Sequence, residues 1–142
     1  MPEQPFFAIG TLTDYICVMP KSLPGRALVA FRLTFGPMSW LTPNLVMVAM
    51  GGDPSSNPQA SYMSRLFGVR DLILGVGVLC SRGSARRLWW QLGIACDAAD
   101  TVAGVLAVRG GAFPNNLRTR ASVLAEVTGV CLGAAALASD EI

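Results

Sequence analysis

Acidic and basic side chains lie inside stretches of this chain that are otherwise apolar. Asp97 and Asp100 are the only charged residues in the 21-residue stretch 88–108. Other apolar stretches contain Arg32, Arg70, Asp71 and Glu126. A charged side chain at the centre of a bilayer costs roughly 2.5–3.5 kcal/mol on insertion scales, so such groups are expected to face one another, water or a ligand. The sequence therefore predicts an interior polar site.

The types and spacing of these residues suit acid–base chemistry. Asp97 and Asp100 are three positions apart, so on a helix they lie on one face. Closely spaced carboxylates in apolar surroundings share protons, and such a pair can supply both an acid and a base. Arg70 lies about 100° around a helix from Asp71, so it is expected to pair with a carboxylate on another helix. There its guanidinium would orient a carbonyl or stabilise negative charge that develops on it.

The charges of this interior set do not balance. Two arginines, Arg32 and Arg70, stand against the four carboxylates Asp71, Asp97, Asp100 and Glu126. The excess acids are expected to be protonated, to lie in a water-filled cavity, or to bind a cation or a polar substrate. The candidate catalytic set is Asp97, Asp100, Arg70, Asp71 and Glu126, with the last two tuning the network. Two other interpretations stay open: a buried network that only sets helix register, and ion or proton conduction through an oligomer.

Composition places the chain in a membrane. Of its 142 residues, 52% are hydrophobic and 14% are charged, whereas about 25% of residues are charged in ordinary soluble domains. The net charge is only +2, and no basic stripe is interleaved with aromatic residues, so nucleic acid is not an expected partner. The expected partners are the lipid bilayer and a hydrophobic small molecule.

Histidine is absent from the chain, which excludes imidazole bases, Ser-His-Asp triads and His-containing metal sites. No nucleotide-binding loop is present either, so we expect no cofactor and no metal. The four cysteines are widely spaced and form no CxxC pair. They are therefore expected to be free thiols that serve as small packing residues: Cys17, Cys80, Cys96 and Cys131.

The elements that would position the site form an all-α, four-helix transmembrane bundle. Its spans are predicted over residues 25–41, 62–80, 88–108 and 120–138. Pro37 is expected to kink the first span, and Pro43 to end it or to open a second, short half over residues 44–50. Residues 51–59 are rich in turn-forming residues, and residues 81–87 form a basic turn. We divide the chain into an N-terminal interfacial segment (1–23), a membrane domain (24–139) and an acidic tail (140–142).

Orientation and packing follow from smaller signals. An even number of spans places both termini on one side. Five basic residues on that side, against three or four on the other, favour cytoplasmic termini. The three tryptophans at span ends are interpreted as an interfacial belt: Trp40, Trp89 and Trp90. The GxxxG sequence Gly129–Gly133 is attributed to packing inside the bundle, to a homo-oligomer contact or to chance.

One stretch of sequence also resembles a known family. The sequence Arg65-Leu-Phe-Gly68-Val-Arg70-Asp71, preceded by Trp40-Leu-Thr-Pro43 and followed one helix later by an Asp among small residues, resembles small four-helix integral membrane proteins. These are grouped as a domain of unknown function in actinobacteria and fungi, and the resemblance covers about residues 25–138. It implies the fold and a membrane location. Some fungal members look like passengers in gene clusters for hydrophobic natural products, which favours a lipophilic substrate.

These signals predict a small integral membrane enzyme that acts on a hydrophobic, polyketide- or terpenoid-like metabolite. The expected reaction is cofactor-free acid–base catalysis of the cyclase or isomerase type, in secondary-metabolite biosynthesis. The alternative is a non-catalytic accessory or scaffold subunit, in which the same charges hold the helices together and the partner is another membrane protein or a second copy. A third interpretation, a proton-coupled carrier, would require an oligomer.

Overall fold

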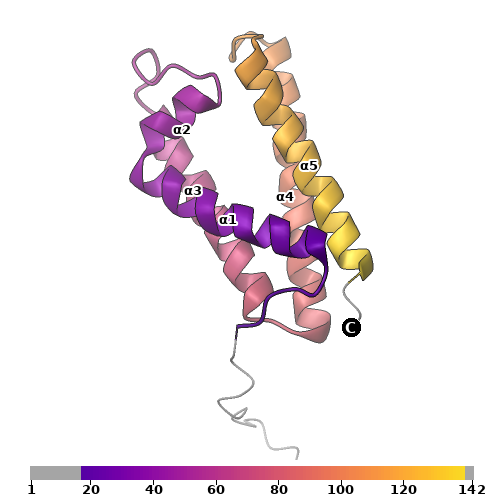
Figure 1. Ribbon diagram of the computed structural model, residues 1–142. Coiled ribbons are helices and arrows are strands. Elements are labelled where there is room, and N and C mark those ends of the chain that lie inside the picture. The colour runs from indigo at the N-terminus through magenta and orange to yellow at the C-terminus, as the bar shows by residue number, and fades with distance from the viewer. Residues whose placement is uncertain (1–16, 140–142) are drawn as a thin grey trace, which may run out of the picture.

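The protein is all-helical over the residues that the structure describes. A computed structural model describes residues 17–139 (Figure 1). Its five helices are α1 (Leu23–Leu41), α2 (Pro43–Ala49), α3 (Ala60–Leu79), α4 (Gly83–Arg109) and α5 (Leu117–Ser139). The all-α prediction is confirmed for this part of the chain. Most of the predicted interfacial segment, and the acidic tail, lie outside the described residues.

The predicted number of membrane spans is wrong by the measure of length and apolar character. Among the described helices, only α4 and α5 are long and apolar enough to cross a membrane. Helix α3 is 20 residues long, but it holds three charged residues: Arg65, Arg70 and Asp71. The two arginines of α1, Arg26 and Arg32, lower its apolar character in the same way. Helix α2 has only seven residues, too few for a span.

Local sequence signals place the ends of the helices close to their predicted positions. The Ser22 hydroxyl accepts a hydrogen bond from the Gly25 N–H (3.3 Å) and so caps the start of α1. Helix α1 ends at Leu41, and Pro43 opens α2, as predicted for a proline that cannot continue a helix. The predicted basic turn is shorter than expected, because α4 begins at Gly83 and takes in Arg86.

The helices pack as a bundle that one of them crosses at an angle. In Figure 1, α4 and α5 lie side by side, and α1 runs obliquely across the bundle. Helix α1 packs against α3 and also reaches α5. The segment before α1 and the end of α5 lie at the same end of the bundle (Figure 1), as an even number of long helices predicts.

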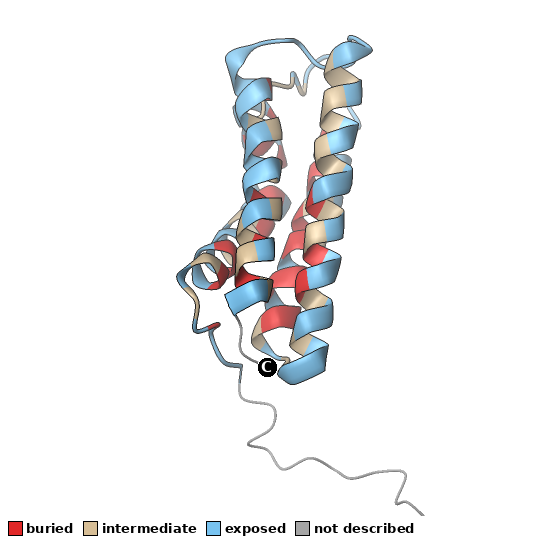
Figure 2. Cartoon of the chain, turned by 90° about the vertical axis from the view of Figure 1, so that its right-hand side faces the viewer, coloured by how far each residue is buried: buried red, intermediate tan, exposed pale blue. Residues whose placement is uncertain are grey.

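The outer surface of the bundle is apolar and its interior carries polar and charged groups. Figure 2 shows the exposed residues on the outward sides of the helices and the buried ones on their inward sides. Large exposed apolar side chains occur on all four long helices; examples are Phe31, Trp40, Leu66, Ile73, Leu92, Leu106 and Leu124. Buried polar or charged residues are Arg32, Ser39, Ser64, Asp71, Asp97 and Thr119. Large apolar side chains exposed on every long helix, together with charged groups inside, differ from the usual water-soluble bundle, in which polar side chains predominate outside.

Glycines allow the helices to approach closely. A Cβ on Gly36 of α1 would lie 2.8 Å from the Gly68 carbonyl oxygen of α3, and a Cβ on Gly68 would lie 2.6 Å from the Gly36 oxygen. On α5, a Cβ on Gly129 would lie 2.6 Å from an Asp97 oxygen, and one on Gly133 would lie 2.8 Å from Ile94. Of the three explanations for the GxxxG sequence, the structure therefore supports packing inside the bundle.

An apolar core fills the end of the bundle where α3 turns into α4. It consists of Leu28, Val29, Val78, Trp90 and Ala136. The belt interpretation of Trp90 is therefore wrong: the side chain is 2% exposed, because it packs in this core against residues of α1, α3 and α5. Trp40 is half exposed, and its assignment to an interfacial belt stays a prediction.

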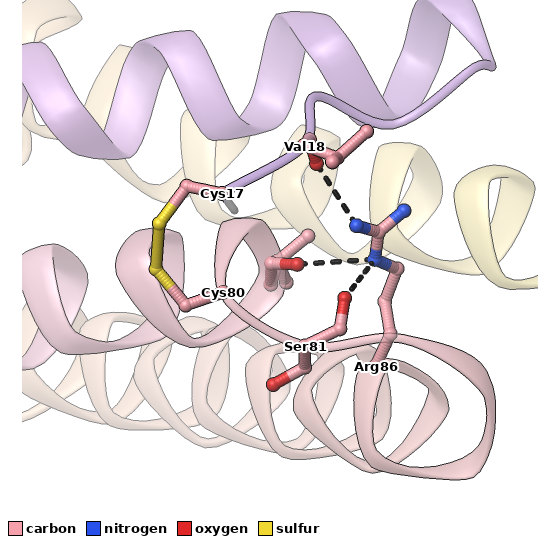
Figure 3. The surroundings of a disulfide bond; sticks show 6 residues. Cys17, Val18, Cys80, Ser81 and Arg86 are labelled. Carbon is pink, nitrogen blue, oxygen red and sulfur yellow. Dashed lines mark hydrogen bonds between the residues drawn. A yellow bond between two sulfur atoms is a disulfide. The ribbon is translucent and has the colours of Figure 1, made fainter. Parts of the chain in front are cut away.

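A disulfide bond closes the same end (Figure 3). It links Cys17, just before α1, to Cys80 at the end of α3, so the prediction of four free cysteines is wrong for this pair. Arg86 donates hydrogen bonds to three carbonyl oxygens beside it: those of Val78 (3.1 Å), Ser81 (2.8 Å) and Val18 (2.9 Å). Cys96 and Cys131 are free thiols.

Candidate functional site

Arg32 is the centre of a buried ion-pair network at mid-bundle. It projects from α1 with 3% of its surface exposed. Its Nη1 donates to Asp71 Oδ1 of α3 (2.9 Å), and its Nη2 donates to both carboxylate oxygens of Asp97 on α4 (2.8 and 2.7 Å). Helix α5 closes the network from the fourth side, because Gly129 leaves room for the Asp97 carboxylate. One guanidinium thus joins three helices.

Arg70 forms a second set of ion pairs beside the first. Its Nη1 pairs with the Asp100 carboxylate of α4, which confirms the predicted partner on another helix. Its Nη2 also lies 3.3 Å from Asp71 Oδ1, so the expectation that adjacent residues would not pair is wrong. The long arginine side chain bends back far enough to offset the angle between them. Its guanidinium also lies 5.1 Å from the centre of the Phe67 ring, a cation–π contact.

The two aspartates of α4 do not form a proton-sharing pair. Asp97 pairs with Arg32 and Asp100 with Arg70, so each carboxylate has a guanidinium of its own. Both face inward, as their spacing predicts, but the arginines on α1 and α3 separate their roles. Asp97 is buried, with 4% of its surface exposed, and it does not line the cavity described next.

A partly open cavity of about 250 Å³ extends from this network toward the end of the bundle that holds α2. Its walls are mostly apolar and include three phenylalanines, Phe35, Phe67 and Phe113, as well as Met47 and Val123. Arg70, Asp100 and Glu126 supply its charged groups. The structure thus brings three of the five predicted site residues to one cavity and leaves Asp71 and Asp97 behind it.

Glu126 differs from the other interior carboxylates because it has no basic partner. Among the described residues, none forms a hydrogen bond or an ion pair with it, whereas Asp71, Asp97 and Asp100 each contact at least one arginine. It is half-buried on α5. The charge count predicted more interior carboxylates than arginines. Among the described residues, Glu126 is the interior carboxylate that contacts no arginine.

Two serines line the cavity that were not among the predicted site residues. Ser39 is fully buried and lines the cavity, and its hydroxyl has no hydrogen-bond partner among the described residues. Ser64, also in the wall, donates to the Ser39 carbonyl oxygen (3.4 Å). Ser39 lies seven positions after Arg32, and Ser64 lies seven positions before Asp71. Because seven residues make about two helical turns, each serine shares a helix face with that charged residue, and this spacing could have identified both.

The arrangement combines proton-transfer groups with a cationic group in an apolar cavity. Within residues 17–139, no group of three or more Cys, Asp or Glu side chains is placed to hold a metal ion. Comparison of the chain with protein-family models, with curated proteins and with solved structures finds no match. The resemblance to a four-helix membrane family stays a prediction.

Proposed function

We propose that this protein is a small integral membrane enzyme that isomerises or cyclises a hydrophobic, polyketide- or terpenoid-like metabolite, in secondary-metabolite biosynthesis, without a cofactor. The observation that supports this most directly is the cavity, because its apolar walls lead to Arg70, Asp100 and Glu126. Small-molecule sites are typically apolar with a few polar groups at defined positions. The apolar outer surface supports the entry of such a substrate from the bilayer.

In the proposed reaction, Glu126 is the group that moves the proton. Its carboxylate removes a proton from a carbon next to a substrate carbonyl, and the electron pair of the broken C–H bond moves onto the carbonyl oxygen. Arg70 stabilises the enolate formed, as positioned donors do in other enzymes; its Nε is buried without a partner among the described residues. When a carbon–carbon double bond adjoins the deprotonated carbon, the anion is a dienolate. Its C=O bond re-forms, the double bond shifts by one carbon, and Glu126 returns the proton to the far carbon of the original double bond, which completes an isomerisation.

Cyclisation begins with the same enolate and differs only in the second step. The enolate carbon attacks a second carbonyl carbon of the same substrate, a C–C bond forms, and the proton held by Glu126 passes to the new alkoxide oxygen. Asp100 holds the Arg70 guanidinium by its ion pair. Asp71 and Asp97 act as positioning residues, because they contact the arginines and not the cavity.

The experiment compares lipid-soluble metabolites of the native host in strains with the intact gene, a deletion and Glu126→Gln, at matched protein levels in the membrane. We expect the same precursor to accumulate in the deletion and in Glu126→Gln, because the amide cannot accept the proton. The matched control is Asp53→Asn, the same chemical change in the α2–α3 loop. Asp53 is exposed, and hydrogen bonds from Ser55 hold the pKa of its carboxyl below its usual value. A wild-type profile in Glu126→Gln would refute the proposed catalysis.

A second candidate function is supported by the Arg32 network. An accessory or scaffold subunit needs a rigid bundle and no reaction, and Arg32 links α1 to two other helices through interior contacts alone. In that case the partner is another membrane protein or a second copy. Co-purification of a partner that persists in Glu126→Gln, together with an unchanged metabolite profile in the deletion strain, would favour this function.

A further inference from the structure

We propose that the cavity binds a lipophilic organic cation, with its ammonium group beside Glu126 and its apolar body against Phe35 and Phe113. This inference rests on the proposed function in that it concerns the same cavity, and it adds the charge class of the ligand. It is carried by three independent observations: the charge balance of the interior, the aromatic walls and an unpartnered buried hydroxyl.

The interior of the bundle carries more negative than positive groups. Arg32 and Arg70 already contact Asp71, Asp97 and Asp100, so three carboxylates share two guanidinium groups. Glu126 adds a fourth carboxylate, and no arginine among the described residues contacts it. A carboxylate in apolar surroundings is stabilised by a cation nearby. An anionic ligand would instead meet Asp100 and Glu126 in a cavity whose one arginine is already paired.

The walls of the cavity suit the body of such a ligand. Phe35 and Phe113 line it from α1 and from the α4–α5 loop. Aromatic faces attract cations, most strongly when the cation is removed from water. Phe67 in the same cavity already forms such a contact with Arg70. The fully buried Ser39 hydroxyl, without a partner among the described residues, adds a polar group for the ligand.

The cavity has the size for one ring and a small ammonium group. An apolar cavity of about 150 Å³ in another protein binds benzene, and this one measures about 250 Å³. The position also agrees with the proposed reaction. A cationic nitrogen acidifies neighbouring C–H bonds, so the oxygens of Glu126 serve first as its counter-ion and then as the proton acceptor.

The test uses two probes of the same shape. Benzyltrimethylammonium carries a positive charge, and 2,2-dimethylpropylbenzene replaces its nitrogen by carbon. Binding of each probe to the purified full chain in detergent is measured by equilibrium dialysis against empty micelles. We expect the cation to bind the wild-type protein more tightly than the neutral probe. Glu126→Gln should weaken binding of the cation about ten- to a hundredfold, the range of one charged contact. It should leave binding of the neutral probe unchanged.

The controls separate charge from folding. Unchanged binding of the neutral probe shows that the cavity of Glu126→Gln is intact, and Glu126→Asp, which keeps the charge, should retain the preference for the cation. Equal binding of both probes to the wild type, equal binding of the cation to wild type and Glu126→Gln, or binding of neither probe would overturn the inference. The metabolite comparison above is independent of these outcomes, so either proposal can fail alone.

Discussion

Arg32 is the residue on which the helices of this protein converge. Its guanidinium makes three hydrogen bonds to two carboxylates on two other helices, and the Cβ position of Gly93 lies 3.3 Å from its Nη2. A side chain at that position would crowd the guanidinium. Buried ion pairs of this kind add little net stability, but removal of one partner leaves the other charge buried and alone.

We predict that Arg32→Met lowers the free energy of unfolding by about 3–5 kcal/mol, the range for breaking a buried pair. Asp71 would keep a contact with Arg70, while Asp97 would lose its partner. Denaturant titration of the purified protein in detergent measures the change, with Arg87→Met, an exposed arginine, as the control. Equal stability of the two variants would show that the network does not hold the bundle.

At the scale of the elements, the close contact between α4 and α5 depends on two glycines of α5, Gly129 and Gly133. Gly129 lies against the Asp97 carboxylate, which Arg32 holds in place, and Gly133 lies against Ile94. Small residues at such positions let backbones approach closely, which is the main source of helix association in a membrane. The same contact places Glu126, one turn before Gly129, on the face of α5 that lines the cavity.

We predict that Gly129→Val destabilises the protein by about 1–3 kcal/mol, the range for overpacking, because the Asp97 oxygen beside it cannot move away without breaking its ion pair. Cys131→Val, at an exposed position on the same helix, should change stability by less than about 0.5 kcal/mol. Thermal unfolding followed by circular dichroism compares the two variants. A Gly129→Val protein as stable as the wild type would mean that α5 packs more loosely than described.

At the scale of the whole molecule, two signals about orientation disagree. The end of the bundle that holds Cys17 and Cys80 also carries Lys21, Arg26 and the arginines of the α3–α4 turn. The excess of basic residues favours the cytoplasm for this end, as the sequence alone predicted. The disulfide bond favours an oxidising compartment, since cytoplasmic thiols are usually kept reduced. The difference in basic residues is small, and the disulfide bond favours the opposite orientation to the one predicted from them.

An oxidising compartment on the disulfide side, if that side faces the medium, predicts that a reductant unable to cross the membrane reaches the bond. In the double variant Cys96→Ser/Cys131→Ser, only Cys17 and Cys80 remain to react with a maleimide reagent after denaturation. We expect no labelling from untreated cells, and labelling after intact cells are exposed to a membrane-impermeant phosphine reductant. Labelling without any reductant would place these thiols in the cytoplasm and restore the orientation predicted from the basic residues.

The sequence by itself determined the helices and the inward direction of the charges. Prolines, turn residues and apolar periodicity mark element ends through local backbone preferences, and so the break at Pro43 and the loop before α3 were predictable. The spacing of Asp97 and Asp100 placed both on one face, because helix geometry is the same in every context. The cost of exposing a charge to lipid then predicted that this face would turn inward.

The tertiary structure decided which groups meet. The pairing of Arg32 with Asp97 and the separation of the two α4 aspartates depend on how α1 crosses the other helices, and no local preference encodes that crossing. The same holds for Glu126, which contacts no arginine among residues 17–139. The disulfide joins residues 63 positions apart, and the cavity draws its walls from all five helices. These features arise from contacts between distant segments. Such contacts join the interior charges into an ion-pair network that links the helices, with a cavity beside it.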